Sequence, residues 1–166
     1  MTSLTCGRFR LSYLFILLLM ATGLIGCEQK PKIAEPAYIK MRAYNHTEDY
    51  VHQYYLDGAW GGNSFAYGGG GKFVCCIGVP EKWRPGLTAT VRWTTSASRA
   101  SKKPYTGETW HEQVVEIEPY DKVGNTMNTH FLPDNKIRLI VSNFSSGYPN
   151  YPGPAYPEKP AGWPID

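Results

Sequence analysis

The density of glycine and proline after residue 26 constrains the fold most. The 140 residues from 27 to 166 contain 14 glycines and all 13 prolines, but only four leucines. Glycine and proline destabilise helix interiors by about 1 and 3 kcal/mol, and helical bundles are rich in leucine. The same segment holds 20 aromatic residues, which favour strands. The sequence therefore predicts a β-rich domain with long loops.

Short alternating segments indicate where the strands lie. In 87–95, Leu87, Ala89, Val91 and Trp93 share one face, and threonines and Arg92 share the other. Pro133-Asp134-Asn135 is typical of a hairpin turn between two such segments. We expect an all-β, antiparallel sandwich of about seven strands within residues 37–143, with a partly open barrel as the alternative. The predicted strands are 38–44, 51–57, 73–79, 87–95, 110–118, 126–132 and 136–142.

Three segments fall outside this pattern. Residues 27–36 are polar with two prolines and are typical of a short tether. Residues 58–71 carry seven glycines, which favours a loop. Residues 144–166 carry six prolines among aromatic residues, so we expect an extended, polyproline-like tail and no central strand.

Residues 1–26 have the features of a bacterial export signal. Arg8 and Arg10 precede an uncharged, mostly apolar run over 11–25, which is short for a membrane span. The run ends in Leu24-Ile25-Gly26-Cys27, which resembles the lipobox of bacterial lipoproteins. That resemblance implies cleavage between Gly26 and Cys27 and lipidation of the Cys27 thiol. An ordinary signal peptide or a signal anchor is the alternative.

Lipidation would place the protein on a membrane. Several acyl chains on one cysteine are enough for stable anchoring. Glu28 follows the lipidated position, where aspartate is usual for retention in the inner membrane of enteric bacteria. We therefore expect an outer-membrane lipoprotein that faces the periplasm.

Charge and motifs exclude several classes of function. Without the signal the chain has 15 basic and 14 acidic residues, which disfavours a nucleic-acid binder. The run from Gly68 to Lys72 resembles a phosphate-binding loop, but Ala66 and Phe73 stand where that motif needs glycine and a hydroxyl residue. The sequence contains no Gly-x-Ser-x-Gly motif. We expect no catalytic residue and no cofactor.

The four histidines give no metal motif. His46, His52, His111 and His130 are scattered, and none is paired with cysteine or histidine at the spacing of metal ligands. We therefore expect no metal site.

Cys75 and Cys76 are adjacent and form the one unusual cysteine feature of the predicted domain. In a regular strand their side chains would point to opposite faces, so a disulfide between them would distort the strand. One alternative is a buried cysteine beside a second packed under a loop. The other is a vicinal disulfide, which an oxidising compartment would favour.

Several blocks of the chain together resemble the bacterial lipoprotein family catalogued as domain of unknown function 3304. They are Asp57-Gly58, Cys75-Cys76, the run from Pro80 to Leu87, Val91-Arg92-Trp93, the run from Val115 to Tyr120, His130 to Asp134 and Ile140 to Asn143. Family members are commonly encoded beside phospholipase effectors of type VI secretion, and several are taken to be their immunity proteins. The resemblance therefore implies a lipoprotein that binds and blocks a secreted lipase without being an enzyme.

The binding surface does not follow from the resemblance. Tyrosine and tryptophan on loops supply rigid contact area and are enriched at interaction hot spots. Two groups are candidates, and their alternative role is to pack back on the domain and cover sheet edges. The groups are Trp60, Phe65 and Tyr67, and Tyr148, Tyr151 and Tyr156. A structural or assembly lipoprotein of the envelope, docking through its tail, is the alternative function.

Overall fold

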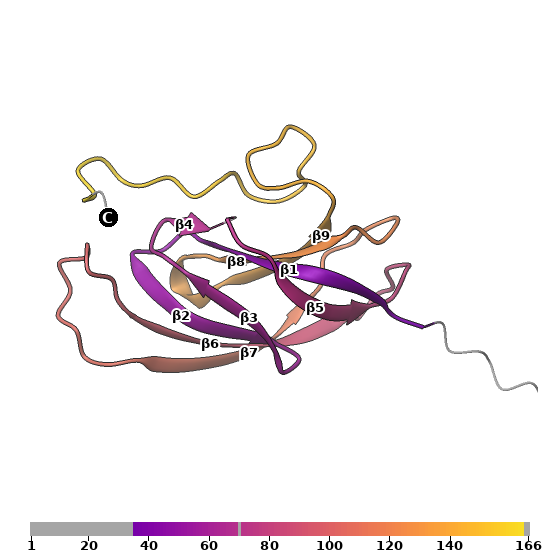
Figure 1. Cartoon of the computed structure of the whole chain (residues 1–166), viewed down its shortest axis with the longest axis horizontal. Helices are drawn as coiled ribbons and strands as arrows, with labels where there is room; N and C mark the ends of the chain where they lie inside the picture. The colour runs from indigo at the N-terminus through magenta and orange to yellow at the C-terminus, as the bar shows by residue number, and fades with distance from the viewer. Residues whose placement is uncertain (1–34, 70, 165–166) are drawn as a thin grey trace, which may run out of the picture. The chain divides into compact units, whose positions relative to one another are not determined.

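The computed structural model describes residues 35–69 and 71–164, and within them all regular elements except one short 3₁₀ turn are strands (Figure 1). The expected signal peptide, Gly26, Cys27 and most of the tether lie outside these residues. The all-β prediction is confirmed. The strands are β1 (Ala37–Asn45), β2 (Asp49–Leu56), β3 (Ala59–Ser64), β4 (Gly68–Gly69), β5 (Val74–Val79), β6 (Thr88–Ala97), β7 (Thr109–Glu116), β8 (Thr126–Phe131) and β9 (Ile137–Ser142).

The strands form two sheets that pack as a sandwich. Sheet A has the order β4-β1-β8-β9, and β5 pairs with β1 on the same side as β4. Sheet B has the order β3-β2-β6-β7. The pairs are antiparallel except β1 with β8, which run parallel, so the purely antiparallel arrangement that we predicted is wrong for this pair. Because β1 and β8 lie far apart in sequence, no hairpin links them and their relative direction is not fixed by a turn.

The alternation in the sequence sets which side chains enter the core. Along β6, Ala89, Val91 and Trp93 are buried between the sheets, whereas Thr88 and Arg92 are exposed. The turn Pro133–Asn135 joins the antiparallel strands β8 and β9, as its sequence predicts. Each large apolar side chain buried this way stabilises the fold by about 1.5–3 kcal/mol.

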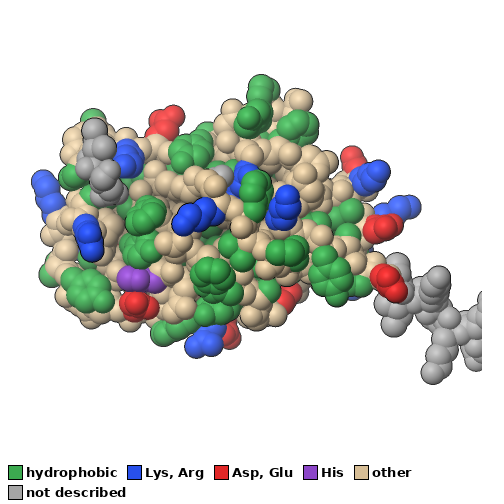
Figure 2. Space-filling model, viewed as in Figure 1, with side chains coloured by type: hydrophobic (Ala, Val, Ile, Leu, Met, Phe, Trp, Pro, Cys, Tyr) green, Lys and Arg blue, Asp and Glu red, His purple; other side chains and the backbone are tan. Residues whose placement is uncertain are grey.

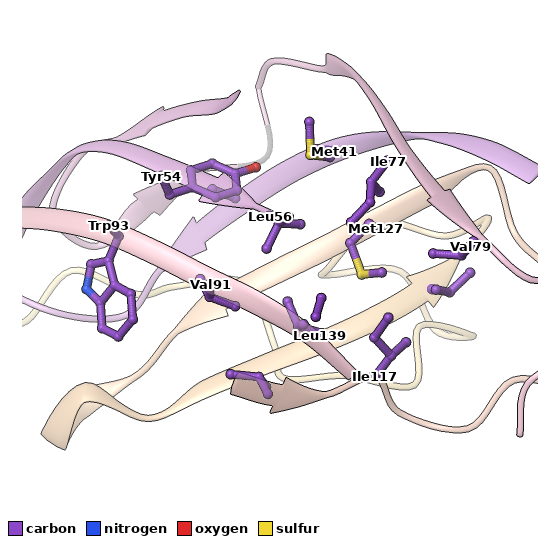
Figure 3. Close-up of a cluster of buried hydrophobic side chains, with 14 of the residues drawn as sticks. Met41, Tyr54, Leu56, Ile77, Val79, Val91, Trp93, Ile117, Met127 and Leu139 are labelled. Atoms are coloured by element: carbon purple, nitrogen blue, oxygen red, sulfur yellow. The ribbon is translucent and has the colours of Figure 1, made fainter. Parts of the chain in front are cut away.

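The core lies between the two sheets and draws on both (Figure 3). Met41 and Met127 come from sheet A, and Tyr54, Leu56 and Val91 come from sheet B. All five are essentially inaccessible to solvent. Close packing of these side chains makes the two sheets one cooperative unit and fixes which residues remain on the outer faces.

The glycine-rich segment is more ordered than predicted, because residues 58–71 include β3 and β4. Its glycines allow close approach of other elements. A side chain at Gly61 would overlap the ring of Tyr54. One at Gly69 would overlap the backbone of Ala43, and Gly69 also has a positive φ of 136°. Glycine here permits tight packing of the sheet, and the prediction of a plain loop was wrong.

The proline-rich tail lies along the outer face of sheet A. In Figure 1 the yellow segment runs beside β1, β4, β8 and β9, on the side opposite sheet B. A side chain at Gly153 would overlap Ile140 of β9, and Ser146 Oγ donates a hydrogen bond to the carbonyl of Pro154 at 2.8 Å. No helix in the described part of the chain is long and apolar enough to cross a membrane.

Candidate functional site

The first group of predicted binding residues separates into three places. Trp60 stands on β3 with its side chain on the outer face of sheet B. Phe65 stacks on Tyr50, with ring centres 5.1 Å apart. Tyr67 makes an edge contact with Trp163 of the tail. Only Trp60 therefore belongs to a face that is continuous with other strands.

The tail tyrosines divide between buried contacts and solvent. The hydroxyl of Tyr151 lies 2.5 Å from Nε2 of His130, and Tyr156 donates to the carbonyl of Gly69 at 2.9 Å. Tyr148 is exposed. Two of these three residues thus hold the tail to sheet A, and their hydroxyls are already occupied.

An aromatic face covers the outer side of sheet B. Tyr55 pairs directly with Trp60 on β3 and with Arg92 on β6. The Arg92 guanidinium lies 4.2 Å from the ring centre of Trp110 on β7, and Tyr55 stacks on the same ring. We define the aromatic face as Tyr55, Trp60, Arg92, Trp110 and Val114.

The large side chains of the aromatic face are open to solvent. Trp60 is 54% exposed and Trp110 is 45% exposed. Neighbouring strands hold them in fixed register, so they form a rigid surface. Tryptophan, tyrosine and arginine are the residue types enriched at interaction hot spots. The sequence predicted the strand at 110–118 but gave Trp110 no role, although alternation places Trp110 and Val114 on the same side as Glu112 and Glu116.

The edge of β7 adjoins the aromatic face. β7 ends the strand order of sheet B and pairs with β6 from Thr109 to Glu116. Just beyond it, Ile117 forms an isolated bridge to Leu139 of sheet A. An edge strand presents backbone groups that can pair with another chain. A partner could therefore contact both the aromatic face and this edge.

A polar cluster is buried beneath the tail. Arg42 donates hydrogen bonds to the hydroxyls of Tyr44 and Ser145, and the backbone amide of Ser146 donates to the same Tyr44 hydroxyl. His130 stacks on Tyr44, with ring centres 4.7 Å apart. The tail thus supplies partners for polar groups that the sheet alone would leave unsatisfied.

Burial sets the ionisation of the two histidines in this region. Burial, together with the charges of His46 and Arg138, lowers the pKa of His130 from 6.5 to about 3. Partial burial also lowers the pKa of His46, whose Nε2 lies 2.8 Å from Nδ1 of His130. Burial of Tyr151 raises its pKa. His130 is therefore a neutral, fully enclosed ring that joins sheet to tail and presents no surface to a substrate.

A cleft of about 560 Å³ is lined by Ser96 and His52, and His52 also contacts Glu108, a grouping that the sequence did not connect. Nε2 of His52 lies 2.7 Å from Oγ of Ser96, and Nδ1 lies 3.4 Å from Glu108. This order resembles that of an acyl-transfer triad. However, Ser96 is only 8% exposed and lies inside β6, whereas hydrolase nucleophiles stand on an exposed sharp turn. The contacts fit a structural hydrogen-bond chain better.

Cys75 and Cys76 are joined by a vicinal disulfide across a cis peptide bond. The β1–β5 pairing shifts at this point, because Ile39 pairs with Ile77 and Met41 with Val74. Two residues of β5 therefore oppose one of β1, which is the pattern of a bulge. Cys75 is exposed and Cys76 half-buried, so neither fills the core. Within the described residues no group of His, Cys, Asp or Glu is arranged to hold a metal ion.

Comparison with known proteins gives one match. A family described as a protein of unknown function (DUF3304) matches residues 44–139, which is more than half of the chain. The matched region runs from the end of β1 into β9 and includes the paired cysteines. No curated protein and no solved structure matches the chain.

Proposed function

We propose that this chain, which belongs to the DUF3304 family, is a membrane-anchored immunity protein that binds and inhibits a secreted phospholipase effector. The aromatic face of sheet B is the observation that carries the proposal. It combines exposed tryptophans with an arginine on a rigid sheet. Inhibition by occlusion needs a surface of this kind and no catalytic group.

The chemistry of the aromatic face suits tight and specific binding. Large exposed apolar groups gain free energy when a partner removes them from water, at roughly 25 cal/mol per Å². Because sheet pairing already fixes Trp60 and Trp110, little conformational entropy is lost on binding. Arg92 adds a cation that can pair with a carboxylate of the partner. The adjoining β7 edge offers backbone hydrogen bonds next to this centre.

The anchor would increase the efficiency of inhibition. A phospholipase acts at the membrane, and a lipid on Cys27 would hold its inhibitor at that surface. Tethering raises the effective concentration of the binding site without any new contact. The lipobox at Leu24–Cys27 and the residue Glu28 support a periplasm-facing position on the outer membrane.

The alternative function is a structural or assembly lipoprotein that docks through its tail. Its support was the aromatic, proline-rich composition of residues 144–166. Tyr151 and Tyr156 contact the chain's own sheet A, which leaves Tyr148 as the exposed member of that group. A partner would have to displace the tail or use a small part of it. The immunity function is therefore the better supported of the two.

The test is protection of bacteria from the neighbouring lipase expressed in the periplasm. The wild-type chain should prevent killing, and Trp60→Ser with Trp110→Ser should abolish protection. Tyr148→Ser, an exposed aromatic position on the tail, is the matched control and should protect fully. Titration calorimetry with the purified lipase should show affinity at least about tenfold weaker for the double variant. Equal killing with and without the wild-type chain would rule out the immunity function.

A further inference from the structure

A second exposed surface lies at the start of β1, on the outer face of sheet A. Tyr38 and Lys40 alternate with core residues along β1, and Lys72 and Phe73 come just before β5. Tyr38 is 75% exposed and Phe73 is 50% exposed. We define the basic–aromatic patch as Tyr38, Lys40, Lys72 and Phe73. Lys and Arg side chains stand beside hydrophobic ones on the face of the molecule that Figure 2 shows.

Two cations of β1 hold the Phe73 ring in place. The guanidinium carbon of Arg42 lies 3.9 Å from the ring centre and Nζ of Lys40 lies 5.2 Å from it. Arg42 is itself buried and hydrogen-bonded to Tyr44, so it fixes the inner side of the ring. Arg42 and Lys40 therefore hold one side of the Phe73 ring, while half of its surface stays in solvent.

The patch has an uncompensated positive charge. Within the described residues, Lys40, Arg42 and Lys72 form no ion pair with a carboxylate. Lys40 and Lys72 are exposed beside exposed rings. Aromatic rings at the level of the headgroups, with lysines reaching phosphates, are the chemistry by which proteins bind the surface of a bilayer.

We propose that the basic–aromatic patch binds the anionic phospholipid surface of the membrane that carries the anchor. This inference rests on the anchored location within the proposed function, but not on the identity of the inhibited protein. Ala37 is ten positions after Cys27, which limits the reach of the tether to about 35 Å. The patch begins one residue later, so it is among the parts of the domain closest to the anchor along the chain.

Binding in this way would orient the domain. The outer faces of two packed sheets point in opposite directions. With the start of β1 against the lipid, the aromatic face of sheet B would point away from the bilayer. Trp60 and Lys72 line one cleft of about 240 Å³, so the patch and the aromatic face meet at the edge where β3 approaches β5. Trp110 on β7, at the other end of the strand order of sheet B, would remain free for the lipase.

Vesicle co-sedimentation tests this proposal with residues 27–166 carrying Cys27→Ser, which cannot be lipidated. This protein should bind vesicles of phosphatidylethanolamine and phosphatidylglycerol at low salt. It should bind phosphatidylcholine vesicles at least about tenfold more weakly. Lys40→Glu with Phe73→Ser should weaken binding to the anionic vesicles by a similar factor, and added salt should weaken binding of the unchanged patch.

Trp110→Ser on β7, at the end of sheet B away from the patch, is the control and should leave vesicle binding unchanged. Lys40→Gln, a mild exposed change, should give an intermediate affinity and guards against misfolding of the double variant. Equal binding by the patch variants, or no binding of the unchanged patch to anionic vesicles, would overturn the proposal. Inhibition of the lipase on a soluble ester is measured separately, so its failure would not affect this result.

Discussion

On the outer face of sheet A polar side chains are buried, and on the outer face of sheet B aromatic side chains are exposed. This is the reverse of the usual pattern. On sheet A the face carries Arg42 and His130, and the tail buries both. On sheet B the face carries Trp60 and Trp110, and they remain in solvent. The tail covers the polar face because it supplies hydrogen-bond partners, which buried polar groups require. The uncovered aromatic face is the surface at which we propose that the lipase binds.

Removal of the tail, which covers the outer face of sheet A, should cause the largest loss of stability. A chain ending at Asn143 would expose Arg42, Tyr44 and His130 and lose their partners on residues 144–164. We expect its free energy of unfolding to fall by about 4 kcal/mol. Urea denaturation followed by tryptophan fluorescence measures this change. An unchanged midpoint would show that the tail is not part of the cooperative unit.

The second largest loss of stability should come from acid, which acts on the face of sheet A that the tail covers. The pKa of His130 is about 3 in the folded protein and near 6.5 when unfolded, so the unfolded chain binds a proton that the folded chain does not. Stability should therefore fall as the pH drops below about 6.5, by about 2 kcal/mol between pH 7 and pH 5. Denaturation at both pH values tests this for the wild type and for His130→Gln. The variant should lose less stability, and equal losses would remove His130 as the cause.

A single hydroxyl should have a smaller effect. Tyr151→Phe keeps the ring but removes the partner of Nε2 of His130, and leaving a buried group unpaired costs about 1.5 kcal/mol. Thermal unfolding measures the difference. Tyr148→Phe is the matched control on the same tail and should leave stability unchanged, because that residue is exposed. Equal effects of the two changes would contradict a specific contact between tail and sheet.

Substitutions on the aromatic face should have the smallest effect on stability. Trp60→Ser and Trp110→Ser remove rings that are about half exposed, so each should lower the free energy of unfolding by only about 1 kcal/mol. Urea denaturation checks this alongside the binding measurements. A large loss of stability would mean that these tryptophans support the sheet, and the contrast between the two faces would disappear.

The sequence predicted the parts of the fold that depend on local pattern. Alternation from Leu87 to Thr95 identified β6 because Ala89, Val91 and Trp93, two residues apart, are all buried in the core. It missed β3 and β4, where glycine leaves no side chain to alternate. Gly61 is there to make room for Tyr54, which comes from another strand, and such contacts are tertiary. The parallel pairing of β1 with β8 is also tertiary and has no local signal.

The candidate surfaces were predictable only in part. Trp60 was predicted as a binding residue, and it does lie on an exposed face. We predicted that Trp110 lies in a strand but gave it no role, because the sequence alone does not show which outer face of the sandwich the tail covers. Tyr151 and Tyr156 had suitable chemistry, but the polar groups that hold them, on His130 and Gly69, come from distant strands.

The position of β1 has a mechanical consequence. β1 is the first strand after residue 36, and it is paired along both edges, with β5 and β4 on one side and β8 on the other. A pulling force from the N-terminal side would act along β1, so the bonds on both edges would be loaded in shear at once. Peeling an edge strand would instead break its bonds one at a time. The proposed anchor on Cys27 would therefore connect to the domain through a strand that is paired along both edges.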